Sequence, residues 1–186
     1  LATAGADAGA RAGALVNLGN ARRRQGRAEE AEACFLQALA LREAAGDDVG
    51  AATALVGAAM AARDRGDATA ALERLERTLV LYGRLGDPGG QAAASTNLAV
   101  LLASTGDLDA ADPYFRQALA FNRAAGDRQG QATALNNLGC LAKERGDLGG
   151  AESYFREALE MLGRLGNPRE RAETLDELAG TLDAAG

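Results

Sequence analysis

The chain has 186 residues and a net charge of −6, and 47% of its residues are hydrophobic although only 4% are aromatic. It has no His and two cysteines, Cys34 and Cys140, which lie 106 positions apart, and this excludes imidazole-dependent catalysis and the usual zinc clusters. The acidic balance argues against binding to a phosphate backbone, and no apolar run approaches the roughly 18 residues of a membrane span. We therefore expect a cytoplasmic, non-catalytic protein without a metal or cofactor.

Glycine recurs along the chain at a fixed spacing. One series repeats every 40 residues and a second series lies halfway between its members. The two series are Gly26, Gly66, Gly106 and Gly146, and Gly46, Gly86, Gly126 and Gly166. Asp or Asn follows every one of them except Gly26, which Arg27 follows. A glycine followed by Asp is typical of one helix ending in a left-handed residue and the next helix beginning at an N-cap.

The stretches between these glycines carry apolar residues at helical spacing, as in Leu135, Leu138 and Ala142. The predicted helices cover residues 8–25, 28–45, 48–65, 68–85, 88–105, 108–125, 128–145, 148–165 and 168–185. Pro113 falls inside one of them, where it removes a backbone hydrogen bond. That helix therefore starts near Asp109 or Asp112, is kinked, or tolerates the irregularity on its outer surface.

Each 40-residue unit is thus a helix hairpin, and one hairpin cannot bury its own apolar face without a stacked neighbour. We predict one all-α domain over residues 1–186, with repeats at about 7–46, 47–86, 87–126 and 127–166 and a capping helix at 167–186. Residues 1–7 align with residues 41–47, which predicts that the chain begins in the tail of an earlier second helix of a longer protein. Thr174 and Thr181 replace Ala or Leu and predict a polar end cap with a natural stop downstream.

The four units resemble the tetratricopeptide repeat family, whose pattern places Leu and small residues in the first helix and Ala, Phe and Ala in the second. The matching residues are Leu15, Leu18 and Gly19 with Ala31, Phe35 and Ala38; Leu98 and Ala99 with Ala111, Phe115 and Ala118; and Leu135, Leu138 and Gly139 with Ala151, Phe155 and Ala158. The second unit is the most degenerate, and the period exceeds the family norm of about 34 residues. The repeats look most like those of kinesin light chains, Pins-type polarity adaptors and bacterial signalling and transcriptional regulators.

The resemblance implies a right-handed superhelical solenoid whose first helices line a concave groove that binds a peptide or a partner surface. The groove residues that it implies are Asn17, Asn20, Arg23, Arg24, Met60, Arg63, Asn97, Val100, Asn136, Asn137, Lys143 and Asp176. Asn17, Asn97 and Asn137 share one phase and carry amides that suit an extended peptide backbone, unless they bond neighbouring helices instead. The bases with which chaperone-binding members hold a terminal carboxylate are absent, so that specificity is not expected.

Charge is distributed unevenly, since residues 1–93 carry 11 bases and 12 acids whereas residues 94–186 carry 9 and 14. We expect an interaction module that binds a protein or peptide and neither nucleic acid nor membrane. The alternative is a ligand-sensing array within a larger bacterial signalling or transcriptional regulator. Association of exposed array ends into a homo-oligomer also remains open.

Overall fold

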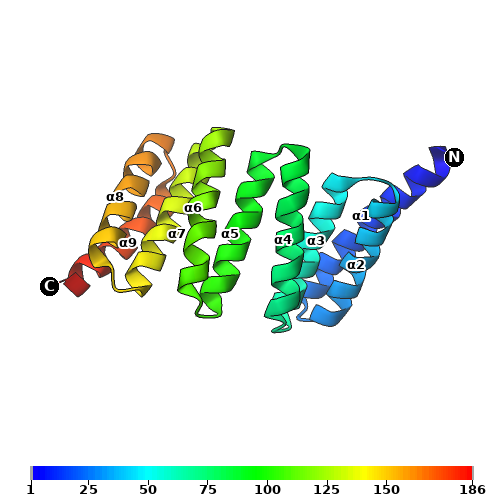
Figure 1. Cartoon of the computed structure of the whole chain (residues 1–186), viewed down its shortest axis with the longest axis horizontal. Coiled ribbons are helices and arrows are strands. Elements are labelled where there is room, and N and C mark those ends of the chain that lie inside the picture. The colour runs from blue at the N-terminus through cyan, green and yellow to red at the C-terminus, as the bar shows by residue number, and fades with distance from the viewer. Residues whose placement is uncertain (1, 186) are drawn as a thin grey trace. The chain divides into compact units, whose positions relative to one another are not determined.

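The computed structural model describes the backbone of residues 2–185 and the side chains of residues 7–185, and within this range it contains nine α-helices and no strand (Figure 1). The helices are α1 (Ala2–Arg24), α2 (Ala28–Ala44), α3 (Asp48–Asp64), α4 (Ala68–Leu85), α5 (Pro88–Ser104), α6 (Leu108–Ala125), α7 (Arg128–Glu144), α8 (Leu148–Leu165) and α9 (Pro168–Ala185). The predicted all-α repeat fold is confirmed, and all helix ends except the start of α1 lie within a residue or so of the predicted bounds.

The helix boundaries form as the glycine and aspartate pattern predicts. All eight glycines of the two series have a positive φ, between 63° and 85°. The aspartate after each accepts a hydrogen bond from the backbone N–H three residues on, for example Asp47 from Gly50 at 2.8 Å and Asp147 from Gly150 at 2.9 Å. Arg27 makes no such cap, because its guanidinium only donates hydrogen bonds and cannot accept one from a backbone N–H. Each turn therefore ends one helix with a residue free of Cβ strain and starts the next with a side-chain acceptor.

The first helix differs from the prediction. We expected a break near Asp7 between the tail of an earlier helix and a new one, but α1 begins at Ala2 and continues through Asp7 to Arg24. The position that corresponds to Gly46 is occupied by Ala6, which favours the right-handed helix and does not readily take a positive φ. Without a left-handed residue the chain has no reason to turn there, so the expected break near Asp7 is absent.

Pro113 does not delay the start of its helix, because α6 begins at Leu108. Its ring lies on an exposed position, one residue after the half-buried Asp112. The structure therefore favours the tolerated irregularity over a later helix start.

The chain divides into two compact units, unit 1 (Leu1–Gly90) and unit 2 (Gln91–Gly186). In unit 1 the fully buried ring of Phe35 packs with Ala31, Ala58 and Ala61. In unit 2 Phe155 is also fully buried and packs with Ala142 and Ala151. Each unit is thus held by stacked hairpins whose small residues surround a few large ones.

The glycine of the Leu-x-x-Leu-Gly segment makes these close contacts possible. A Cβ on Gly139 would lie 2.5 Å from Cε1 of Phe155, and a Cβ on Gly19 would lie 2.9 Å from the ring of Phe35. Both distances are shorter than any ordinary carbon contact, so only glycine lets the aromatic ring lie flat against the first helix.

The two threonines of the last helix do not face solvent, as the polar end cap that we predicted from them would require. Thr174 and Thr181 are 2% and 1% exposed, and their hydroxyls donate to the carbonyls of Glu170 and Glu177 in the preceding turn. The neighbouring side of α9, one residue on from each threonine, exposes Leu175 and Leu182. The threonines satisfy their own hydroxyls while they face the protein, so the prediction that these two residues form a polar outer face is wrong.

None of the described helices combines the length and the apolar character needed to cross a membrane.

Candidate interaction surface

The residues that sequence analysis assigned to a groove lie on the first helices of the repeats, and each unit can be described separately. In unit 1, α1 presents Asn17, Asn20 and Arg24 as exposed side chains. Asp64 pairs with two of the predicted bases. Its carboxylate lies 3.1 Å from the guanidinium of Arg23 and 3.4 Å from that of Arg63. This contact joins α1 to α3.

Met60 contributes little to this face, because only 9% of its surface is exposed. A small neighbour, Gly57, lies one turn earlier in α3 and a Cβ there would run into the ring of Phe35. Unit 1 therefore offers amides and an arginine–aspartate pair as its polar contacts, with methionine held mainly in the core.

In unit 2 the predicted residues lie on α5, α7 and α9. Val100 is 40% exposed and Asp176 is exposed, whereas Asn97, Asn137 and Lys143 are half-buried. Lys143 Nζ donates to Glu177 Oε2 at 3.0 Å, which connects α7 to α9 across this face. The charge of Lys143 is therefore offset by a carboxylate of the next repeat.

The three phased asparagines do not bond to neighbouring helices in the described part of the chain. No side-chain hydrogen bond of Asn17, Asn97 or Asn137 occurs among residues 7–185, although each could donate two and accept two. Their amides are thus free to meet water or a ligand, and the cross-stack alternative has no support within either unit.

A small cavity of about 200 Å³ lies between α7 and α9. Its polar wall includes Thr133 and Asn136 of α7 and Glu170 and Glu173 of α9. The Oδ1 atom of Asn136 is buried and has no hydrogen-bond partner among the described residues. Glu170 accepts from Gln129, and Glu173 accepts from Arg169 at 3.0 Å. The cavity is therefore rich in acceptors and lacks a positive charge of its own.

Cys140 lies beside this region on α7, one helical turn before the lysine–glutamate pair. Burial raises the pKa of the Cys140 thiol to about 11, and the nearby charge of Glu177 adds to this while Lys143 opposes it. Such a thiol is protonated near neutral pH and behaves as a small apolar side chain. Cys34 is half-buried too, and neither cysteine forms a disulfide.

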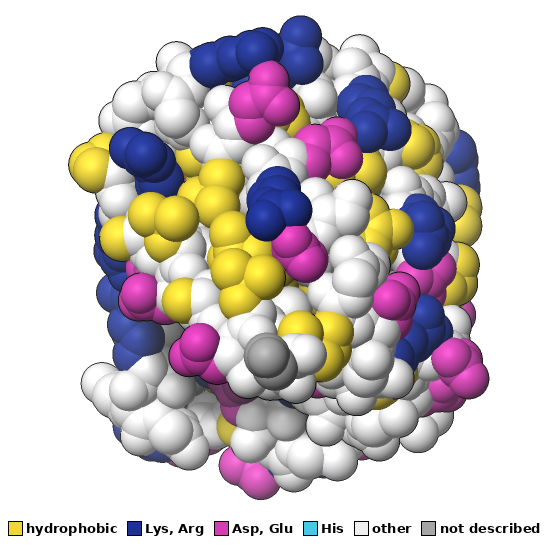
Figure 2. Space-filling view, turned by 90° about the vertical axis from the view of Figure 1, so that its left-hand side faces the viewer, with side chains coloured by type: hydrophobic (Ala, Val, Ile, Leu, Met, Phe, Trp, Pro, Cys, Tyr) yellow, Lys and Arg dark blue, Asp and Glu magenta, His cyan; other side chains and the backbone are white. Residues whose placement is uncertain are grey.

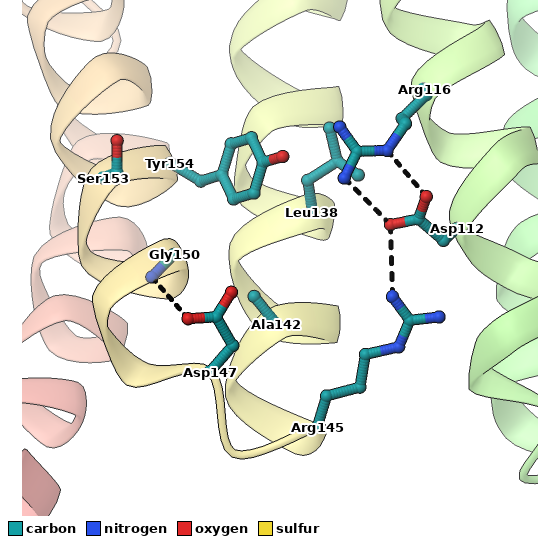
Figure 3. Close-up of a pocket in the computed structure, with 9 residues that line it drawn as sticks. All are labelled: Asp112, Arg116, Leu138, Ala142, Arg145, Asp147, Gly150, Ser153 and Tyr154. Carbon is teal, nitrogen blue, oxygen red and sulfur yellow. Dashed lines mark hydrogen bonds and ion pairs between the residues drawn. The ribbon is translucent and has the colours of Figure 1, made fainter.

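A second cavity of about 290 Å³ lies against α6, α7 and α8 (Figure 3). Asp112 of α6 stands between two arginines there. It accepts from Nε of Arg116 at 2.6 Å and from a guanidinium nitrogen of Arg145 at 3.3 Å, while the ring of Tyr154 reaches in from α8. Both arginines pair with Asp112, and Arg145 also pairs with Asp109 at 2.7 Å. The polar wall of this cavity is therefore a network of ion pairs that joins two repeats.

The described residues hold no group of three or more Cys, Asp or Glu side chains placed to bind a metal ion. What the surface offers is amides, carboxylates and paired bases on helix faces.

A family model described as tetratricopeptide repeat matches residues 10–84 and 90–164. The chain belongs to the tetratricopeptide repeat family.

Solved structures with this fold cover nearly the whole chain. BtubC (BKLC) from P. vanneervenii shares 22% identity at a TM-score of 0.85, over 96% of this chain and 74% of that one. A signal transduction ATPase with numerous domains and a tetratricopeptide repeat sensor, from Pyrococcus horikoshii, shares 14% identity at a TM-score of 0.83. The match covers 94% of this chain and 27% of that protein. Aspartyl phosphate phosphatase F from Bacillus subtilis shares 12% identity at a TM-score of 0.83, and the match covers 94% of this chain and 49% of that protein. These likenesses show the fold, and the chain spans less than half of the last two proteins. A search of curated protein sequences returns no match.

The two stretches matched by the tetratricopeptide repeat model are themselves similar, and this 80-residue period explains contacts that the 40-residue period missed. Glu32 in unit 1 corresponds to Asp112 in unit 2, and Arg65 corresponds to Arg145. Arg65 lies 3.2 Å from Glu32, and Arg145 lies 3.3 Å from Asp112. The 80-residue period is thus the sequence signal for these two positions, and the structure shows that they pair.

Proposed function

We propose that the chain is a non-catalytic interaction module, which binds an extended segment of a partner protein along the first helices of its repeats. The observation that carries the proposal is the set of unpaired amides at one repeat position. Asn17, Asn97 and Asn137 each leave their donors and acceptor unused, and an amide can bond a peptide backbone whatever its side chains are. Backbone recognition of this kind needs no catalytic group.

The charge of unit 2 supports a basic partner segment. Unit 2 has nine bases and 14 acids, a net charge of −5, whereas unit 1 has 11 bases and 12 acids, a net charge of −1. Asp176 is exposed and has no ion pair among the described residues, and Glu173 keeps 59% of its side chain exposed. A lysine-rich or arginine-rich segment would meet a complementary field there, which raises the association rate and makes binding sensitive to salt.

The proposal is tested by affinity capture from a lysate of the source organism with the triple variant Asn17→Ala, Asn97→Ala and Asn137→Ala. The matched control is Gln25→Ala with Gln37→Ala, which removes two exposed amides away from this position. We expect proteins captured by the wild type and the control to be lost by the triple variant. Equal capture by all three would overturn the assignment of these amides.

Affinity is then measured by fluorescence polarisation with segments of the captured protein, at low and at high salt. A basic segment should bind more weakly at high salt, whereas an acidic segment that binds equally at both would contradict the charge argument.

The alternative function is a sensor array that reports binding to a neighbouring effector domain. It is favoured by the likeness to the Pyrococcus horikoshii protein, whose name includes a tetratricopeptide repeat sensor. The sequence of the gene on both sides of this segment decides between the two, since a sensor needs an effector domain on the same chain.

A further inference from the structure

An apolar stripe runs along α9 on the side that faces away from the rest of unit 2. Leu175 and Leu182 are 45% and 43% exposed, and Ala172 and Ala179 lie on the same side at exposed positions. Figure 2 shows hydrophobic side chains gathered on the face formed by α8 and α9. The four residues are spaced by three, four and three positions, which is the spacing of a coiled-coil seam.

The repeat register shows that this stripe is built for helix packing. Forty residues earlier, the corresponding residues of α7 are Ala132, Leu135, Gly139 and Ala142, and all four are buried where α7 packs against α8 and its other neighbours. The described chain places no helix on this side of α9. The α9 stripe therefore continues the type of interface that α7 makes with α8, without an occupant.

We propose that the occupant is α9 of a second copy of this chain, packed antiparallel across a twofold axis. In this arrangement each leucine faces an alanine, Ala172 opposite Leu182 of the partner and Leu175 opposite Ala179 of the partner, and the twofold axis repeats both pairs. Large residues opposite small ones fill the space evenly and let the helices approach closely. Leu178, which is half-buried beside the stripe, faces its own copy.

The charges beside the stripe also fit an antiparallel second copy. Arg169, whose side chain is 88% exposed in its pair with Glu173, comes opposite Asp183 of the partner on one flank. In the isolated helix both are unfavourably placed, because bases at the N-terminus and acids at the C-terminus oppose the helix dipole. Every other described helix except α5 ends in a basic last turn, whereas α9 does not. An antiparallel neighbour supplies a base to Asp183 and a second carboxylate to Arg169.

One position in this arrangement is unfavourable. Asp176 lies on the same flank as Arg169 and Asp183 and faces its own copy across the axis. Like charges that meet in this way weaken association, so Asp176 provides a specific test of the antiparallel register.

Sedimentation velocity over a wide concentration range tests the association. We expect a reversible dimer whose dissociation constant rises at least about tenfold in Leu175→Glu with Leu182→Glu, because two buried apolar contacts become charged. The control is Leu36→Glu with Leu85→Glu, two leucines of unit 1 that are 39% and 38% exposed. A wild type that stays monomeric, or a dimer that the α9 variant leaves intact or the control weakens equally, would overturn the proposal.

Register is tested in a chain that carries Cys34→Ser and Cys140→Ser, in two versions with Ala172→Cys or Leu182→Cys and tags of different mass. Oxidation of the mixture should give the disulfide between the two versions, whereas crosslinking of each version only to itself would show a parallel pair and overturn the arrangement. Asp176→Asn should tighten the dimer, and a weaker dimer would contradict the predicted contact. The inference does not rest on the proposed function, because peptide capture and dimerisation are measured separately.

Discussion

The carboxylate of Glu32 lies 2.6 Å from a guanidinium nitrogen of Arg74, and these side chains are only 11% and 18% exposed. Arg74 also donates to the carbonyl of Ala58 at 3.1 Å, and Arg65 approaches the same carboxylate at 3.2 Å. Glu32 of α2 is thus bound to residues of the following hairpin, and a single acid connects two repeats of unit 1.

Replacement of Glu32 should lower the free energy of unfolding far more than replacement of an exposed acid. Glu32→Gln leaves Arg74 partly buried without its counter-ion, so we expect the free energy of unfolding to fall by about 2 kcal/mol. The control is Glu30→Gln, since Glu30 is 49% exposed in its pairs with Arg22 and Arg27 and its loss should cost less than about 0.5 kcal/mol. Urea unfolding followed by circular dichroism measures both, and equal losses would contradict a special role for Glu32.

The close packing of Gly139 against Phe155 predicts opposite effects for two Gly→Ala substitutions. Gly139→Ala places a methyl group 2.5 Å from the Phe155 ring, and we expect the free energy of unfolding to fall by about 1–3 kcal/mol. At Gly163, in α8, no atom lies within 4 Å of an added Cβ, so Gly163→Ala should stabilise the protein by about 0.5–1 kcal/mol. Thermal unfolding of both variants checks the signs.

If Phe155 is the cause, the double variant Gly139→Ala with Phe155→Leu should lose less stability than the two separate losses added together. Strict additivity would mean that the methyl group and the ring do not interact.

The repeat register could be predicted from sequence because glycine ends a helix and aspartate caps the next one through local backbone geometry. Neither effect depends on contacts with distant parts of the chain. Ala6 shows the same rule at work, since its identity alone accounts for the uninterrupted α1. The inward orientation of Thr174 and Thr181 could not be obtained this way. A threonine is equally suited to a solvent-facing position or to a buried one with its hydroxyl bonded to the preceding turn, and only packing decides between them.

Less of the candidate site than of the helix pattern could be predicted from sequence, because the site depends on contacts between stacked helices. The repeat position of Asn97 or Asn137 follows from the register, but its lack of a bonding partner depends on neighbouring side chains. The Lys143 to Glu177 pair likewise joins residues 34 positions apart whose contact is set by the stacking of α7 and α9. The 80-residue repeat of Glu32 with Asp112 and of Arg65 with Arg145 is visible in the sequence, but the contacts of these pairs depend on how the hairpins stack.

Asp47 should make stability sensitive to acid. The N–H of Gly50 lowers the pKa of its carboxyl, and Arg42, which donates to it at 2.7 Å, acts in the same direction. Because this pKa is lower in the folded protein than in the unfolded chain, the stabilisation is complete above about pH 5 and is lost as the pH falls through the folded pKa. Asp47→Ala should therefore lower the free energy of unfolding by about 1 kcal/mol at pH 7, and by less as the pH falls through the folded pKa.

Urea titrations of wild type and Asp47→Ala at several pH values give this difference directly. The control is Asp7→Ala, which removes an exposed carboxylate from within α1 and no N-cap, and it should show no such loss at pH 7. A cost of Asp47→Ala that does not change with pH would contradict the role of the ionised carboxylate.

The thiol of Cys140 should react slowly. Since burial and the charge of Glu177 raise its pKa to about 11, the thiolate fraction at pH 8 is about a hundredfold below that of an ordinary cysteine. In a chain that carries Cys34→Ser, we expect the rate with a chromogenic disulfide reagent to fall by about that factor relative to a free thiol. Glu177→Gln should raise the rate, because it removes a negative charge and frees Lys143, whereas Glu173→Gln should not. A wild-type rate equal to that of a free thiol would show that Cys140 is not shielded by α7 and its neighbours.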